Sequence, residues 1–82
     1  MKINKKFGQP IELEWRDACE VSGWKTLDDA LQVPNEVICK TRGYFLGQNK
    51  EYISVVHTVG LDERNDVCGI IHIPISWIKK IK

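Results

Sequence analysis

The stretch from Asp66 to Ile81 constrains the fold more than any other part of the chain. A β-branched, apolar run passes directly into Pro74, about one tight turn follows, and a short segment, Trp77–Ile81, comes after it. Small five-stranded barrels often end in this way, with a strand, a single helical turn and a last strand that returns to pair with the first. The stretch therefore predicts a small antiparallel barrel, and it contains no catalytic or ligand-binding motif.

Length and composition fit one small domain. The chain has 82 residues, of which 43% are hydrophobic and 28% are charged, and this supports one core in a single domain over residues 1–82. No apolar run approaches the ~20 residues that cross a bilayer, and the basic N-terminal segment lacks the apolar stretch of a signal peptide. We therefore expect a cytoplasmic protein without membrane contact. Its three cysteines, Cys19, Cys39 and Cys68, are expected to be free thiols.

Alternation of side chains predicts the strands. Residues 11–17 alternate apolar and charged, which is typical of a half-buried strand with Ile11, Leu13 and Trp15 facing the core. Further strands are predicted at 36–46, 51–59 and 67–74, separated by a hairpin loop at 47–50 and a polar loop at 60–66. With the C-terminal segment, the sequence predicts five strands.

A short helix is predicted between the first two strands. Thr26 can cap its start, Asp28 and Asp29 suit its positive end, and Pro34 stops it. About two turns are too few to be stable alone, so we expect the helix to pack on the sheet. The apolar residues available for that contact are Leu27, Ala30 and Leu31.

These elements predict a mainly β fold: a small five-stranded antiparallel barrel, partly open, with one short helix between the first and second strands. Closing the barrel would hide the strand edges that otherwise promote aggregation. The first and last strands would then be neighbours.

Charge is segregated along the chain, although the net charge is only +1. Residues 11–36 carry seven acids and two bases, and the two terminal segments carry six lysines and no acid. If the first and last strands are neighbours, Glu12 and Glu14 lie beside Lys79 and Lys80. Such cross-strand pairs contribute roughly 0.2–1 kcal/mol each, which explains the segregation without a functional role.

Three sets of residues carry groups that metal binding or catalysis could use. His57, Cys68 and His72 lack the tight pair spacing of a zinc site, so we predict no metal and no cofactor. The cysteines lack the cationic surroundings that lower a thiol pKa. Glu12 and Glu14 lie on an exposed strand without a desolvated cleft. The sequence therefore predicts no catalytic residues and a protein that is not an enzyme.

One face of the 36–46 strand suggests nucleic-acid binding. Lys40, Arg42 and Tyr44 alternate on it, and bases with an interleaved aromatic are typical of barrels that bind single strands. The terminal lysines could extend this face. A dedicated nucleic-acid-binding protein is usually more basic than this chain. The alternative interpretation of these residues is a solvated outer face without a ligand.

Three tryptophans are many for a chain of this length. The alternation makes Trp15 a core residue, whereas Trp24 and Trp77 lie outside regular strands. Either the two cap the open ends of the barrel, or they form an exposed patch for a protein partner or a second copy.

Several short motifs occur in a fixed order. They are Trp15-x-Asp17, Gly23-Trp24, Thr41–Leu46, Tyr52–Val55 and Ile73-Pro74 followed by Ile78–Ile81. This set resembles small phage and prophage proteins in which a Trp-x-Asp strand precedes a Gly-Tyr-Leu hairpin. The resemblance implies a phage or prophage origin and an SH3-like or Sm-like barrel, and it supplies no catalytic residue and no settled activity.

The sequence thus favours a non-enzymatic binding module that recognises a protein or other macromolecular partner, or associates with itself as a homo-oligomer, in the cytoplasm of a bacterial host. Single-stranded nucleic acid is the alternative partner. The candidate surface includes the loops at 47–50 and 60–66. The candidate binding residues are Trp24, Lys40, Arg42, Tyr44 and Trp77.

Overall fold

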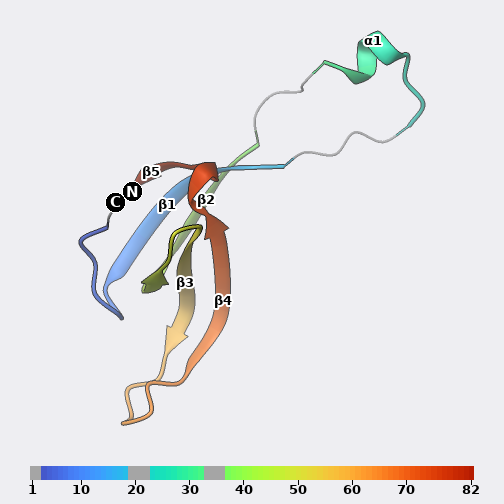
Figure 1. The fold of residues 1–82 in the computed structure, drawn as a ribbon. Helices are drawn as coiled ribbons and strands as arrows, with labels where there is room; N and C mark the ends of the chain where they lie inside the picture. The colour runs from blue at the N-terminus through green and yellow to red at the C-terminus, as the bar shows by residue number, and fades with distance from the viewer. Residues whose placement is uncertain (1–2, 19–22, 33–36) are drawn as a thin grey trace.

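The computed structural model describes residues 3–18, 23–32 and 37–82 (Figure 1). Its strands are β1 (Pro10–Asp17), β2 (Val37–Gln48), β3 (Tyr52–Val59), β4 (Val67–Pro74) and β5 (Ile78–Ile81). A four-residue helix, α1 (Leu27–Ala30), lies between β1 and β2, and a 3-10 turn, η1 (Ile75–Trp77), lies between β4 and β5. The predicted mainly β fold, with five antiparallel strands and one short helix, is confirmed, as is the single helical turn after Pro74.

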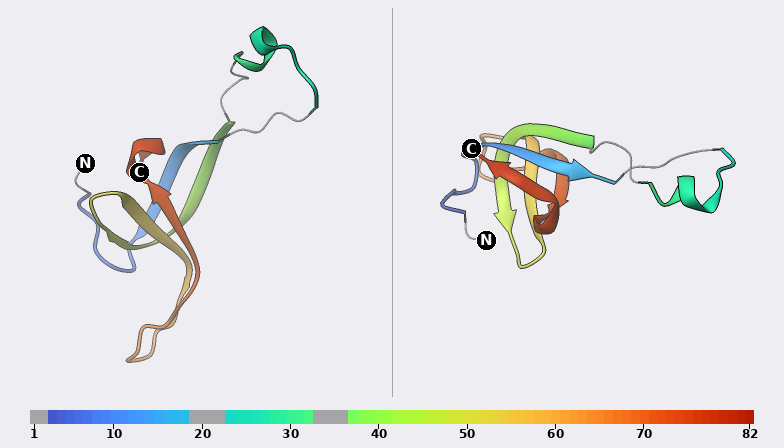
Figure 2. Two further views of the ribbon diagram at one scale, coloured as in Figure 1. Left: turned by 45° about the vertical axis from the view of Figure 1, so that its right-hand side comes forward. Right: turned by 90° about the horizontal axis from the view of Figure 1, so that it is seen from above.

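The five strands form one open antiparallel sheet in the order β4-β3-β2-β1-β5. The expected pairing of the first and last strands is present, with Leu13 opposite Ile81 and Glu14 opposite Lys80. The three residues of η1 bring the end of β4 and the start of β5 together at one corner (Figure 2). The ladder nevertheless ends at β4 on one side and β5 on the other, so the prediction that closure hides the strand edges is wrong.

The inner face of the curved sheet holds the core. Ile11 and Leu13 of β1 are buried there, as predicted, together with residues of β2, β3 and β4. Trp15, predicted to be a core residue, is half-buried and packs against this cluster. The other buried members of the cluster are Phe45, Ile53, Val55 and Ile73.

A bulge bends β2 so that it can pair with β1 along one half and with β3 along the other. The β2–β3 register shifts between Phe45 and Gly47, and a bulge of this kind bends and twists the strand that carries it. Strand β2 also runs to Gln48, two residues beyond the predicted end. The hairpin is correspondingly tighter, with the Asn49 Oδ1 accepting the Glu51 and Tyr52 amides at 2.8 Å.

The segment around α1 differs most from expectation. We call residues 23–32 the arm; it lies away from the sheet (Figures 1 and 2). The predicted cap is present, since the Thr26 Oγ1 accepts the Asp29 amide at 3.2 Å. However, α1 is a single turn without a buried residue, so the prediction that it packs on the sheet is wrong. Pro34, its predicted stop, lies outside the described residues.

The register of β1 with β2 explains why the arm lies outside. The two strands stay paired as far as Asp17 and Val37, beyond the last buried residue of β1, which is Leu13. The chain between them therefore leaves from the tip of a two-stranded ribbon instead of from the edge of the core. The one-turn helix α1 buries none of its residues there.

Two further expectations concern membrane-spanning segments and the cysteines. Within the described ranges, no helix has the length and apolar character needed to cross a bilayer. Cys39 and Cys68 are free thiols, as predicted. Cys19 lies outside the described residues.

The close approach of β2 to β3 generates a test of this fold. A Cβ at Gly43 would lie 2.5 Å from the Val56 carbonyl oxygen and 2.7 Å from the Val55 Cγ1, whereas a Cβ at Gly47 would meet nothing within 4 Å. We expect Gly43→Ala to lower the free energy of unfolding by about 1–3 kcal/mol, the usual cost of overpacking. Urea denaturation measures it.

Gly47→Ala in the same strand is the matched control and should change the free energy of unfolding by less than about 0.5 kcal/mol. Equal effects of the two substitutions would contradict the close approach of β2 to β3.

Candidate interaction surfaces

Alternating acids and bases line the outer face of β1 and β2. The register places Glu12 opposite Arg42 and Glu14 opposite Lys40. The Arg42 Nε donates a hydrogen bond to the Glu12 Oε1, and the Lys40 Nζ lies 3.9 Å from the Glu14 Oε1. These carboxylates are therefore paired with bases of β2, which the sequence prediction did not foresee.

Glu12 also receives a base from the C-terminal segment. Its Oε2 lies 3.9 Å from the Lys82 Nζ, and the Glu12 and Lys82 backbones exchange two hydrogen bonds of 2.8 and 3.0 Å. The predicted proximity of the terminal lysines to the acidic first strand is thus present, with Lys80 opposite Glu14 in the register and Lys82 closest to Glu12.

The bases around Glu12 lower the pKa of its carboxyl below the ordinary value of 4.5. The hydrogen bond from Arg42 is the largest cause, while partial desolvation opposes it, and the charges of Arg42, Lys40 and Lys82 add to the lowering. Glu12 is therefore ionised at neutral pH, and it offsets part of the positive charge on this face.

An apolar row crosses the same outer face. Pro10 pairs with Tyr44, Tyr44 with Val56, and Val56 with Ile70, so the row spans β1 to β4. We call these four residues the outer row. Val56 is 1% exposed although it lies outside the core cluster, whereas Tyr44 and Ile70 are 41% and 49% exposed. The predicted candidate Tyr44 therefore belongs to an apolar surface as well as to the face that carries Lys40 and Arg42.

A depression of about 360 Å³ adjoins the outer row at Pro10. We call it the basic hollow, because three cationic side chains and one carboxylate line it. The Lys5 Nζ there donates to the Pro10 carbonyl oxygen at 2.8 Å. The side chains of Arg42 and Lys82 are 77% and 62% exposed, whereas that of Glu12 is only 14% exposed. The lining residues are Lys5, Pro10, Ile11, Glu12, Arg42, Gly43 and Lys82.

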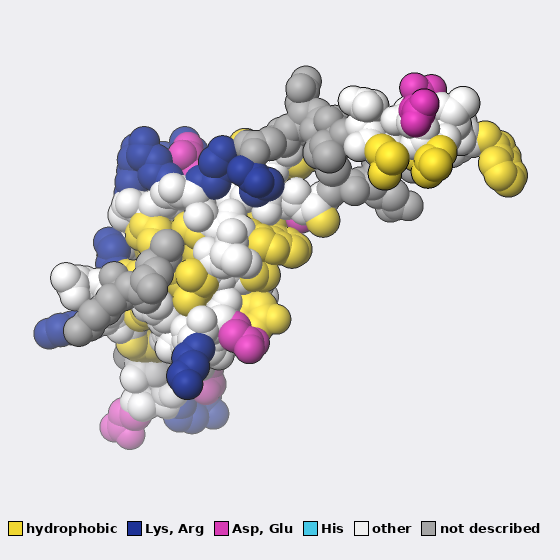
Figure 3. Space-filling view, turned by 45° about the horizontal axis from the view of Figure 1, so that its top comes forward, with side chains coloured by type: hydrophobic (Ala, Val, Ile, Leu, Met, Phe, Trp, Pro, Cys, Tyr) yellow, Lys and Arg dark blue, Asp and Glu magenta, His cyan; other side chains and the backbone are white. Residues whose placement is uncertain are grey.

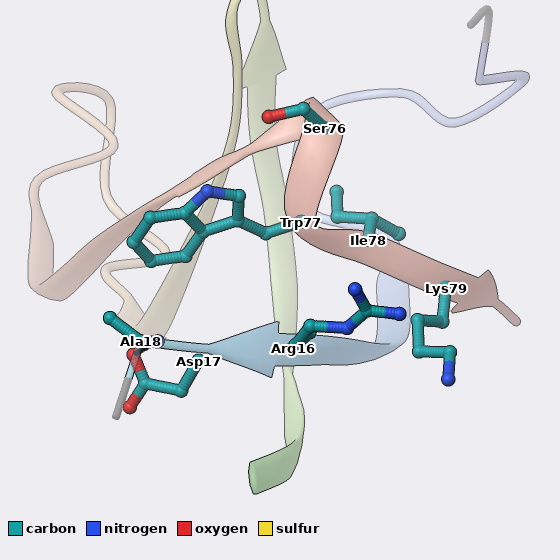
Figure 4. A pocket seen from close by; sticks show the side chains of 7 residues that line it. All are labelled: Arg16, Asp17, Ala18, Ser76, Trp77, Ile78 and Lys79. Atoms are coloured by element: carbon teal, nitrogen blue, oxygen red, sulfur yellow. Dashed lines mark hydrogen bonds between the residues drawn. The ribbon is translucent and has the colours of Figure 1, made fainter. Parts of the chain in front are cut away.

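A second depression lies beside Trp77, at the corner formed by η1 and the end of β1 (Figure 4). The Trp77 ring stacks on Trp15, with centroids 6.3 Å apart and planes 16° apart. The Trp15 Nε1 donates to the Thr41 Oγ1 at 2.9 Å. Trp77 thus packs at one end of the core and, being 39% exposed, also lines a pocket of about 450 Å³. The other lining residues are Arg16, Asp17, Ala18, Ser76, Ile78 and Lys79.

The arm presents three large apolar side chains to solvent. Trp24, Leu27 and Leu31 are 101%, 75% and 70% exposed. Hydrophobic and acidic side chains lie on different sides of α1 (Figure 3), where the acids are Asp28 and Asp29. The sequence prediction singled out Trp24 and assigned Leu27 and Leu31 to packing. The helical spacing of Leu27 and Leu31 is visible in the sequence. The lack of a surface that covers these two side chains is not.

The residues considered for a metal site do not converge. Cys68 pairs with Thr58 and His72 with Ser54 on the outer face, whereas His57 belongs to the inner-face positions of β3 and lies against Gly69. Each histidine Nδ1 shares a 2.6 Å hydrogen bond with a hydroxyl, from Ser54 or Thr58. Among the described residues, no three His, Cys, Asp or Glu side chains are placed to hold a metal ion.

The structure therefore distributes the predicted binding residues over three places. Lys40, Arg42 and Tyr44 share the outer face, Trp77 lies at the η1 corner, and Trp24 lies on the arm. Comparisons with protein-family models, with curated proteins and with solved structures give no match. The resemblance to phage proteins accordingly remains a prediction.

The position of Glu12 generates a prediction about acid stability. Because the folded state lowers the pKa of this carboxyl, its stabilising effect is complete above the unfolded pKa near 4.5 and is lost as pH falls through the folded pKa. We expect Glu12→Gln to lower the urea midpoint at pH 7, and we expect the difference from wild type to vanish near pH 2.

Glu63→Gln, in the exposed loop at 60–66, is the control and should leave the urea midpoint at pH 7 unchanged. A Glu12→Gln difference of the same size at both pH values would show that the carboxylate charge is not involved.

Proposed function

We propose that this chain is a non-enzymatic binding module of phage or prophage type, built on a small SH3-like sheet, which recognises a protein partner through its arm. The SH3-like assignment is supported by the return of β5 to β1, the 3-10 turn before β5 and the bent β2. The single observation that carries the binding proposal is the exposure of Trp24, Leu27 and Leu31 on a segment that projects from the sheet.

Physical reasons connect these side chains with a protein partner. Burying a large apolar side chain is worth about 1.5–3 kcal/mol, so three uncovered ones on one short segment represent a substantial free energy available for binding. Leu27 and Leu31 lie one helical turn apart, at the first residue and the C-cap of α1, and Trp24 lies in the extended segment just before it. Tryptophan is also among the residues that most often dominate binding energy at interfaces.

The nucleic-acid alternative has less support. Lys40 and Arg42 share the outer face with Tyr44, as a single-strand binder requires, but Glu14 and Glu12 pair with them. A phosphate approaching this face would meet two carboxylates, which weakens the electrostatic attraction that dominates nucleic-acid affinity. The arm, in contrast, carries the acids Asp28 and Asp29 and would repel a phosphate backbone.

The arm can be tested by partner capture. Immobilised wild-type chain and the Trp24→Ala and Leu27→Ala variants are exposed to host lysate, and bound proteins are quantified by mass spectrometry. We expect each variant to bind its partner about thirtyfold more weakly, since truncation of an interface anchor typically costs about 2 kcal/mol or more. The fold should be unchanged, because the arm contributes no buried residue.

Leu61→Ala is the matched control, because Leu61 is 97% exposed in a different loop, and it should retain the partner. The proposed function would be wrong if the arm variants captured the same proteins, in the same amounts, as the wild type and also kept the wild-type mass by light scattering.

A further inference from the structure

We infer that the arm docks on a second copy of this chain, seating its apolar side chains along the outer row and its acids against the basic hollow. This inference rests on the proposed function, because it uses the arm as the binding element, and it adds the identity of the partner. Both surfaces belong to one chain, so the docking is reciprocal in a two-fold symmetric pair.

Charge complementarity is the first argument for a second copy. The arm carries two acids, Asp28 and Asp29, and one base, Lys25, a net charge of −1, whereas the basic hollow is lined by three bases and one acid, a net charge of +2. Lys and Arg side chains gather on the sheet, while the arm presents acidic and hydrophobic ones (Figure 3). Each copy therefore attracts the other through unlike surfaces, and this steers association.

The receiving surface matches the arm in chemistry. The basic hollow combines exposed cations, Arg42 and Lys82, with an apolar wall at Pro10. The outer row adds the half-exposed Tyr44 and Ile70, which lie on either side of the buried Val56. The outer row can therefore receive the apolar side of the arm. The cations of the basic hollow can receive its acidic side.

Geometry favours a second copy over the arm's own sheet. The arm lies beyond the core, past the paired ends of β1 and β2 (Figures 1 and 2). No residue of α1 is buried. Docking on another copy keeps the pairing of β1 with β2 as far as Asp17 and Val37.

A charge-swap experiment tests the inference. The arm variant carries Asp28→Lys and Asp29→Lys, and the hollow variant carries Lys5→Glu and Lys82→Glu. We expect wild type to have twice the 9.5 kDa chain mass by light scattering, and each variant alone to have the single-chain mass. An equimolar mixture should recover the double mass, because each arm then meets a hollow of opposite charge.

The control variant carries Asp62→Lys and Glu63→Lys in the loop at 60–66, so its net charge changes as in the arm variant. It should keep the double mass. If the hollow variant fails to fold, Trp24→Ala serves instead, because Trp24 is fully exposed and its loss should give the single-chain mass with an unchanged circular dichroism spectrum.

Two outcomes would overturn the inference. One is a wild-type chain that keeps the single-chain mass up to millimolar concentration, and the other is an arm variant that remains as dimeric as the control. If the wild type is monomeric but another protein is captured in a Trp24-dependent manner, only the second-copy inference fails. If the arm variants alter neither mass nor capture, the proposed function fails as well.

Discussion

The register between β1 and β2 determines most of this structure. By placing Glu12 opposite Arg42 and Glu14 opposite Lys40, it also turns Ile11 and Leu13 to the opposite, inner face. A shift by one residue would bury the charges and expose the core residues, so the two faces stabilise the same pairing. The fold depends on this register more than on any single contact.

The same pairing decides where binding surfaces can form. Because β1 and β2 remain paired beyond the core, the chain between them emerges from a ribbon tip, and Trp24 is carried into solvent with its neighbours. The bend of β2 meanwhile lets one strand serve both halves of the sheet, and the registers align Pro10, Tyr44, Val56 and Ile70 across four strands. The apolar projection thus follows from the β1–β2 pairing, and the apolar row follows from that pairing together with those of β2 with β3 and β3 with β4.

Prediction from sequence succeeded where local pattern was sufficient. Strict alternation in β1 identified which of its residues face the core and which face outward, and the run into Pro74 identified the helical turn before β5. It failed for α1, because Leu27 and Leu31 have the spacing of a packed helix whether or not a sheet lies nearby. It also missed Arg42 as the partner of Glu12, since cross-strand pairs depend on register.

The sequence by itself determined the composition of each surface: an acidic segment with helical apolar spacing, basic termini, and strands with one polar face. Those properties are local, since period and charge are fixed along the chain. Only the tertiary structure decided which of these surfaces cover one another. Residues far apart in sequence meet through strand register and through the bend of β2, and that is why Trp77 stacks on Trp15 while Trp24 stays uncovered.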